Sequence, residues 1–324
     1  MPLPDPLVAP LEPSMAGMLQ AVNAQPSLHT LPPPVVRDIF RQMSAPAEAP
    51  PPVRWVRDLQ VPGPGGALTV RWYEPEPAGA AGTPPPLVVY LHGGGWVFGD
   101  LDSYDTVCRT LCRASGMAVA SVDYRLAPEH RFPAAVDDAE AALRWLAANA
   151  RELGADPARL AVAGDSAGAQ LAATAAMRVH GTLPAGAAVR ALGLVYPPAH
   201  PHPVPTAAKR ENATGQLLTA DVMQWCTDLY LGEDAALRHH PDAALLCATQ
   251  LARLPRCWVA TLGYDVLRDD GLALVDALQE RGVPVHHVHE PAGVHGCITL
   301  PAQVSAVGPR LLSGLAAWLR DNVR

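Results

Sequence analysis

The stretch Gly164-Asp165-Ser166-Ala167-Gly168 says most about the fold of this chain. An apolar run at 160–163 precedes it, and an alanine-rich, helix-favouring segment at 169–179 follows it. A strand, a sharp turn and a helix in this order are typical of a nucleophile elbow, in which small residues flank a serine on a strained turn. We therefore predict that Ser166 presents its hydroxyl beyond the end of a strand, at the N-terminus of a helix.

A second stretch, His92-Gly93-Gly94-Gly95-Trp96, ends another apolar run at 87–91. Glycines at a strand end leave backbone N–H groups that a ligand can approach closely. Acyl transfer needs such donors where an oxyanion forms. A flexible glycine turn is the alternative, but the HGGG pattern favours an oxyanion loop. We expect Gly93, Gly94 and Ala167 to donate to the oxyanion, and His92 to order the loop rather than act as the base.

In this class of motif, an acid and then a histidine follow the serine along the chain. His295 lies in a glycine-flanked loop after the predicted strand at 284–290, and Asp265 is the first acid after the one at 257–262. Both positions lie beyond the carboxyl end of a strand, so we predict His295 as the base and Asp265 as its partner. Asp269 is the alternative acid, although Asp269 and Asp270 suit the first turn of the next helix better.

Three further histidines, His286, His287 and His289, lie within the predicted strand at 284–290. His287 and His289 share a face of that strand and could be interpreted as a metal-binding pair. No third and fourth ligands are spaced nearby, whereas a histidine in a strand is more often packed or solvent-facing. We therefore expect no metal, and the chemistry predicted above needs no organic cofactor.

This combination of motifs resembles the hormone-sensitive-lipase group of α/β-hydrolases, the bacterial family IV esterases. The resemblance runs from about residue 53 to the C-terminus. It rests on HGGGW (92–96), DYRLAPEH (123–130), FPAAVDD (132–138), GDSAG (164–168), YDVLRD (264–269) and HG (295–296). It implies an α/β-hydrolase fold with a helical cap, Ser166 as nucleophile, His295 as base and Asp265 as its partner.

Two positions depart from the usual pattern of that family. Ala169 stands where a second glycine usually follows the elbow, which is a small packing change. Cys297 stands where an aromatic residue usually follows His-Gly, so we expect a reshaped pocket and an altered substrate preference near the histidine. The residues predicted to wall the pocket are Trp96, Leu218, Trp225, Val266 and Cys297.

The rest of the chain predicts an α/β fold with a mostly parallel, eight-stranded sheet and helices on both faces. Apolar runs predict strands at 53–59, 68–73, 87–92, 118–123, 160–164, 191–196, 258–263 and 285–289. Helical patterns between or after them include 134–150, 271–281 and 305–319.

Two regions do not follow this alternation. Residues 1–50 are proline-rich with amphipathic stretches at 6–22 and 34–43, and residues 197–240 begin with a proline-rich run and contain a helical pattern at 219–230. A loose tail and a long loop are one interpretation. The resemblance implies instead that 1–50 and 197–240 form two parts of a cap over a catalytic core of 51–196 and 241–324.

Composition narrows the classes of function. The 324 residues are 49% hydrophobic and carry a net charge of −7. A negative net charge does not favour binding to nucleic acid. Apolar stretches fall short of the ~20 residues that a membrane span needs, and the N-terminus lacks a signal-peptide pattern. The six cysteines show no disulfide framework, so we expect reduced thiols and a cytoplasmic protein.

The sequence therefore predicts a serine carboxylesterase that hydrolyses short- to medium-chain acyl esters of small molecules. An amidase or deacetylase with the same triad is the first alternative, because the leaving group cannot be read from these residues. A non-catalytic, ligand-binding hydrolase fold is the second, and the presence of Ser166, Asp265 and His295 argues against it. The resemblance is also compatible with a homodimer.

Overall fold

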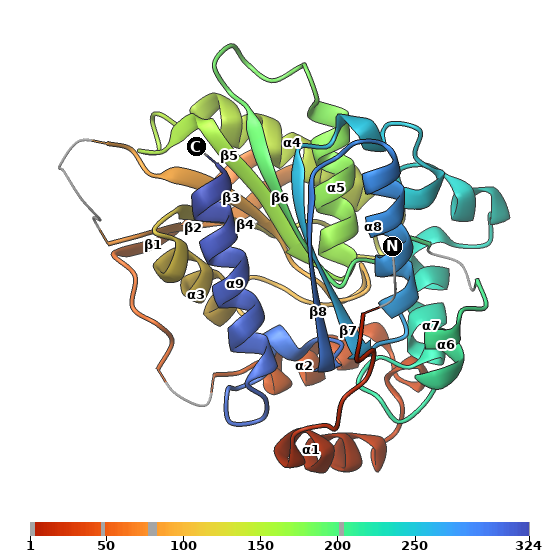
Figure 1. The fold of residues 1–324 in the computed structure, drawn as a ribbon. Helices are drawn as coiled ribbons and strands as arrows, with labels where there is room; N and C mark the ends of the chain where they lie inside the picture. Colours follow the sequence, from red (N-terminus) through yellow and green to blue (C-terminus); the bar gives the residue numbers. More distant parts are fainter. Residues whose placement is uncertain (1–3, 47–48, 77–82, 201–203, 324) are drawn as a thin grey trace.

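A single twisted sheet runs through the part of the chain that the structure describes (Figure 1). This computed structural model describes residues 4–46, 49–76, 83–200 and 204–323. The strands are β1 (Trp55–Gly63), β2 (Gly66–Glu74), β3 (Pro86–Leu91), β4 (Ala118–Val122), β5 (Asp156–Asp165), β6 (Val189–Val195), β7 (Arg256–Tyr264) and β8 (Val285–Val294). Their order is β1-β2-β4-β3-β5-β6-β7-β8, and β2 pairs antiparallel with both of its neighbours while the other pairs are parallel. The predicted α/β fold and its eight strands are confirmed.

Helices cover both faces of this sheet (Figure 1). The α-helices are α1 (Pro13–Asn23), α2 (Pro33–Met43), α3 (Asp105–Ser115), α4 (Ala134–Asn149), α5 (Ala167–Val179), α6 (Ala207–Glu211), α7 (Ala220–Leu231), α8 (Arg268–Glu280) and α9 (Val307–Asn322). Short 3₁₀ turns are η1 (Leu28–Thr30), η2 (Ala235–His239), η3 (Leu245–Cys247), η4 (Leu251–Arg253) and η5 (Cys297–Thr299). Helices α3 and α9 pack together on one face, and α4, α5 and α8 lie on the other.

Two apolar layers hold the helices to the sheet. The layer under α4, α5 and α8 includes Leu143, Leu171 and Leu274, and the layer under α3 and α9 includes Leu111 and Leu315. Helix α5 is buried along almost its whole length, which its many alanines permit because small side chains let the helix lie close to the strands. The core therefore forms around β5 and α5, the two elements that flank the elbow.

The loops that carry the predicted motifs lie at one edge of the sheet. Strands β3, β5, β7 and β8 run parallel, so their carboxyl ends meet there. Helices α1, α2, α6 and α7 gather near the same edge, at the arrowheads of β7 and β8 in Figure 1. The two regions that broke the α/β alternation in the sequence are thus the ones that lie over the motif-bearing loops.

Hydrogen bonds hold the N-terminal segment against the last two strands, β7 and β8. Ala9 N–H donates to the Pro291 carbonyl at 3.0 Å, and the Tyr264 hydroxyl donates to the Ala9 carbonyl at 3.0 Å. His289 Nε2 lies 2.8 Å from the Leu7 carbonyl, to which it donates. The helix α1 that follows therefore starts from a fixed point on the sheet.

The histidines of β8 have partners within the protein. Thr261 Oγ1 lies 2.8 Å from His287 Nε2 and 2.8 Å from His289 Nδ1, so one hydroxyl links the two rings. In the described ranges, no three His, Cys, Asp or Glu side chains are grouped so as to hold a metal ion. These contacts account for the two rings by packing and hydrogen bonding.

Two further properties concern the helices and the cysteines. Over the described residues, no helix has both the length and the apolar character needed to cross a membrane. The six cysteines are free thiols, and all except Cys247 are buried. Burial raises the pKa of Cys108, Cys226, Cys257 and Cys297, so these thiols stay protonated and unreactive at neutral pH.

A core substitution tests the layer under α9. Leu315 is fully buried, and an added Cβ at Gly193 in β6 would lie only 2.5 Å from its Cδ1, so the leucine fills that space tightly. We expect Leu315→Ala to lower the free energy of unfolding by about 2–5 kcal/mol, as measured by urea denaturation. Ser313→Ala, on the exposed side of the same helix, should change it by less than about 0.5 kcal/mol. Equal effects of the two variants would contradict this packing.

The half-buried His287 predicts a loss of stability in acid. Burial, reinforced by the neighbouring His289, lowers the pKa of His287 from 6.5 to about 4. Because the unfolded chain binds this proton first, the stabilising contribution is complete above about pH 6.5 and is lost as the pH falls toward 4. Urea denaturation at pH 7 and pH 4.5 should show a smaller loss of stability for His287→Gln than for the wild type. The exposed His180→Gln should behave like the wild type, and a variant at His287 that does the same would refute the prediction.

Candidate active site

Ser166 lies on a sharp turn between β5 and α5. Its φ of 52° and ψ of −126° place it in a backbone region that residues with a side chain rarely adopt, which is the strain expected of a nucleophile elbow. Glycine is required on both sides, because a Cβ at Gly164 or Gly168 would overlap the Leu91 carbonyl oxygen of the neighbouring β3. The helix N-terminus that follows points its free N–H groups at the same place.

The structure brings the three predicted triad residues into one hydrogen-bonded chain. His295 Nε2 lies 2.9 Å from Ser166 Oγ, and His295 Nδ1 lies 2.8 Å from Asp265 Oδ2. The other carboxylate oxygen of Asp265 accepts the Leu267 N–H at 2.8 Å, which fixes the orientation of the carboxylate. All three side chains are buried, with exposed fractions of 8% for Ser166, 7% for His295 and 0% for Asp265. An acid, an imidazole and a hydroxyl in this order can activate the hydroxyl as a nucleophile.

The alternative acids, Asp269 and Asp270, accept hydrogen bonds from backbone N–H groups outside the triad. Asp269 and Asp270 lie in the first turn of α8, as predicted. Asp269 Oδ2 accepts the Ala208 N–H at 2.8 Å, and Asp270 Oδ2 accepts the His200 N–H at 3.0 Å. The two carboxylates therefore hold the segment around α6 against the core, and His295 is paired with Asp265.

Asp165 is the centre of a buried cluster that the sequence did not predict. Its carboxylate accepts the hydroxyls of Tyr90 and Tyr104 and the Gly93 N–H, each at 2.9 Å, and the Tyr196 hydroxyl at 3.3 Å. Burial raises the pKa of this carboxyl, and the hydrogen bonds oppose that rise. The signal in the sequence was only that an aspartate precedes the serine. Its tyrosine partners lie 31, 61 and 75 residues away along the chain, so the cluster appears only in the fold.

The glycine loop after β3 differs from the expectation at one residue. The Gly93 N–H is engaged with Asp165, so the prediction that it donates to an oxyanion has to be corrected. Gly94 and Gly95 line the cavity next to Ser166, with φ values of 115° and 57°. Among the described residues, the N–H groups of Gly94, Gly95 and Ala167 have no hydrogen-bond partner. These three groups are the donors that the geometry leaves available.

His92 orders this loop, as expected. Its Nδ1 lies 2.7 Å from the Gly93 carbonyl, and its ring stacks on Tyr124 with centroids 4.3 Å apart. Burial lowers the pKa of His92 to about 4, so the ring is neutral at pH 7 and its Nδ1–H donates to that carbonyl. His92 is thus a structural residue behind the N–H groups of Gly94 and Gly95.

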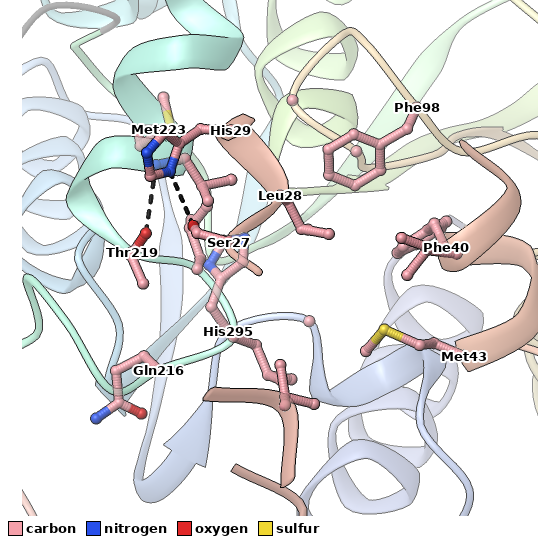
Figure 2. Close-up of a pocket in the computed structure, with 18 of the residues that line it drawn as sticks. Ser27, Leu28, His29, Phe40, Met43, Phe98, Gln216, Thr219, Met223 and His295 are labelled. Atoms are coloured by element: carbon pink, nitrogen blue, oxygen red, sulfur yellow. Dashed lines mark hydrogen bonds between the residues drawn. The ribbon is translucent and has the colours of Figure 1, made fainter. Parts of the chain in front are cut away.

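A cavity of about 680 Å³ opens at Ser166 and His295. Figure 2 shows apolar side chains on one side of it, Leu28, Phe40, Met43 and Phe98. On the other side, Figure 2 shows Ser27, His29, Gln216 and Thr219 together with the apolar Met223. Most of this wall comes from α1, η1, α2 and the segment 214–226, the two regions outside the α/β alternation.

The predicted pocket residues divide into one that lines this cavity and four that do not. Leu218 is part of the lining, but Trp225, Val266 and Cys297 are absent from it. Trp96 is buried behind the loop, where its Nε1 donates to Gln170 Oε1 at 3.0 Å and its ring stacks on Tyr230 at 4.5 Å. The apolar wall was missed although Phe40 and Met43 belong to a predicted amphipathic stretch, 34–43, whose apolar face needed a surface to cover.

Known proteins share this sequence and architecture. Residues 88–299 match the sequence model of a family described as alpha/beta hydrolase fold. Esterase LipI of Mycobacterium tuberculosis is 39% identical over 264 residues, which cover 81% of each protein. Carboxylesterase NlhH of the same organism is 39% identical over 242 residues, which cover 72% of this chain and 73% of that protein.

Solved structures agree with the sequence relatives. A hyperthermophilic esterase from the archaeon Pyrobaculum calidifontis superposes with a TM-score of 0.88 at 35% identity, over 97% of this chain and 99% of that one. A thermostable esterase from Pseudomonas putida gives a TM-score of 0.89 at 29% identity, over 97% and 98%. The family match spans well over half of the chain. Together with these identities it shows that the chain belongs to the α/β-hydrolase family, in the hormone-sensitive-lipase-like group that its motifs predicted.

Proposed function

We propose that this protein is a serine carboxylesterase that hydrolyses short- to medium-chain acyl esters. The observation that carries the proposal is the continuous hydrogen-bonded chain from Asp265 through His295 to Ser166, at 2.8 and 2.9 Å. Relatives named esterase and carboxylesterase support ester substrates, since they match most of the chain.

The proposed reaction follows from the geometry of these groups. Ser166 Oγ attacks the ester carbonyl while His295 Nε2 takes its proton, and Asp265 stabilises the resulting imidazolium through the Nδ1–H. The N–H groups of Gly94, Gly95 and Ala167 stabilise the oxyanion. His295 then protonates the departing alkoxide, and water activated by the same ring releases the acid from Ser166.

The size and chemistry of the cavity support a small substrate. A volume of about 680 Å³ lies within the ~300–1,000 Å³ typical of small-molecule sites. Its apolar side, formed by Leu28, Phe40, Met43 and Phe98, suits an acyl chain. A short or medium chain can therefore bury its apolar surface without leaving the site.

We also propose that residues 1–50 and 197–240 act as a two-part cap on a catalytic core of 51–196 and 241–324. Helices α1 and α2 and the segment 214–226 supply most of the cavity wall beyond the catalytic loops. Arg37 of α2 donates to the Val97 carbonyl at 2.9 Å and so ties this region to the oxyanion loop. Such a cover would exclude water from the reaction and limit the length of the acyl chain.

Hydrolysis of p-nitrophenyl esters from acetate to palmitate tests the proposed activity. The wild type should turn over the short and medium chains and lose activity toward palmitate, because the cavity is limited. Ser166→Ala should lower kcat by about 10⁶, since the triad acts as a unit. Ser313→Ala serves as the matched control and should keep full activity. Folded wild type that hydrolyses none of the esters, or Ser166→Ala that keeps its activity, would refute the proposal.

Asp165→Asn tests whether the buried cluster positions the oxyanion donors. An amide presents a single acceptor oxygen to the three tyrosine hydroxyls and the Gly93 N–H, so the loop that carries Gly94 and Gly95 should lose its fixed position. We expect kcat for p-nitrophenyl butanoate to fall by about 10- to 100-fold, less than direct loss of a donor can cost. The exposed Asp38→Asn should have no effect. A KM change at constant kcat would contradict a role in positioning.

A further inference from the structure

We propose that helix α7 positions the oxyanion donors through Cys226 and Tyr230, two side chains that pack against the glycine loop after β3. This inference rests on the proposed esterase function and adds two positioning residues to it. It is drawn from the contact between Cys226 and Gly95, from the stacking of Tyr230 on Trp96, and from the contacts that fix α7 to the core.

Gly95 is a proposed donor that no hydrogen bond holds in place. Its N–H has to stay free for the oxyanion, and within the residues that the structure describes neither that N–H nor the Gly95 carbonyl has a hydrogen-bond partner. The residues on either side are tied by hydrogen bonds, because the Gly93 N–H donates to Asp165 and the Trp96 carbonyl accepts the Ala127 N–H at 2.9 Å. The position of Gly95 therefore depends on these neighbours and on packing.

Cys226 of α7 supplies packing for Gly95. A Cβ added at Gly95 would lie 2.5 Å from Cys226 Sγ and 2.8 Å from Cys226 Cβ, so the cysteine side chain fills the space beside the Gly95 Cα. Cys226 is 1% exposed, and burial raises the pKa of its thiol, so the thiol stays protonated at neutral pH. Its contribution is therefore contact with the glycine and not chemistry. Because packed interiors transmit small displacements, removal of this thiol would leave Gly95 free to move.

Tyr230 supports the next residue of the glycine loop. Its ring stacks on the ring of Trp96, with centroids 4.5 Å apart and an angle of 4° between the planes. Trp96 has a φ of 62°, which residues with a side chain rarely adopt, so its conformation needs support from its surroundings. Tyr230 follows Cys226 by about one helical turn, so the two side chains lie on the same face of α7. That face therefore contacts two consecutive residues of the loop.

Helix α7 is itself fixed to the core at its C-terminal end. The Tyr230 carbonyl accepts the Phe132 N–H at 2.9 Å, and the Tyr230 ring meets the Phe132 ring edge-on with centroids 5.7 Å apart. The next residue, Leu231, is buried in the apolar layer under α4 and α5. These contacts do not involve the glycine loop, so α7 can serve as a fixed support for it. The proposed cap would then position the donors as well as cover the site.

A ligand that forms an oxyanion tests the inference. Trifluoromethyl pentyl ketone can accept Ser166 Oγ at its carbonyl carbon, so that the carbonyl oxygen becomes the oxyanion while His295 takes the serine proton. The alcohol obtained by reducing this ketone has nearly the same size but no carbonyl, so it binds without an oxyanion. Titrations followed by fluorine NMR give the Kd of each compound without turnover of an ester.

We expect Cys226→Ala and Tyr230→Leu each to raise the Kd of the ketone by about 3- to 30-fold, less than the loss of a whole donor can cost. The Kd of the alcohol should stay the same. The kcat for p-nitrophenyl butanoate should fall by a factor similar to the rise in the ketone Kd, at nearly constant KM, because the donors act in the transition state.

Two further variants serve as controls. Tyr230→Phe keeps the ring and removes a hydroxyl that has no hydrogen-bond partner among the described residues, so it should bind the ketone like the wild type. Cys257→Ala removes another buried thiol, at the amino end of β7 and outside the cavity lining. It should lower the stability of the protein and leave the Kd of both compounds unchanged.

Three results would overturn the inference. An equal rise in the Kd of the ketone and of the alcohol would show that the two side chains shape the pocket and do not position the donors. An unchanged Kd of the ketone in both Cys226→Ala and Tyr230→Leu would show that the loop keeps its position without them. Failure of both variants to fold would show that these side chains support the fold as a whole. Wild type that binds the ketone more tightly than the alcohol but hydrolyses no ester would instead remove the esterase function itself.

Discussion

The close approach of two backbones at the elbow is the constraint on which the site depends. Leu91 of β3 pairs with Gly164 of β5, and the Leu91 carbonyl oxygen lies where a side chain at Gly164 or Gly168 would need to be. This contact fixes the turn at Ser166 and brings the glycine loop after β3 beside it. Asp165, one residue before the serine, then holds Gly93 of that loop. The proposed nucleophile and the proposed oxyanion donors are therefore positioned by one junction between adjacent parallel strands.

Much of this arrangement could be predicted from the sequence. Most of the strands, such as β3, β4 and β6, are apolar runs, and this pattern is local. Ser166, Asp265 and His295 could be chosen because each follows such a run, and the carboxyl ends of parallel strands meet at one edge. The order serine, acid, histidine along the chain then indicated which role each of the three residues takes.

Other features of the site could not be predicted, because they depend on contacts between residues far apart in the sequence. Gly93 and Gly94 look equivalent in the sequence, and only the position of Asp165 shows that Gly93 is occupied. Trp96 was expected in the pocket because it follows the glycines, but its positive φ turns it toward Gln170 and Tyr230. Helix α6 has five residues, too few for a periodic pattern, and its start is capped by Thr206.

Polar contacts help to anchor the two regions outside the α/β alternation. His289 and Tyr264 hold the backbone near Leu7 and Ala9, and Asp269 and Asp270 hold the segment around α6. Arg37 joins α2 to the Val97 and Ala127 carbonyls at 2.9 Å each. Side chains of α1, η1, α2 and the segment 214–226 then line the cavity at Ser166. These anchors thus help to set the shape of the cavity wall.

Covalent labelling of the intact protein tests the central claim most directly. A fluorophosphonate reacts with a serine only where a base activates the hydroxyl and donors stabilise the phosphonyl oxygen, which are the two properties assigned to Ser166. Mass spectrometry after treatment with a slight excess should show one adduct, located on Ser166 by peptide mapping and absent from His295→Ala. An unlabelled wild type, or a label on another residue, would contradict the account.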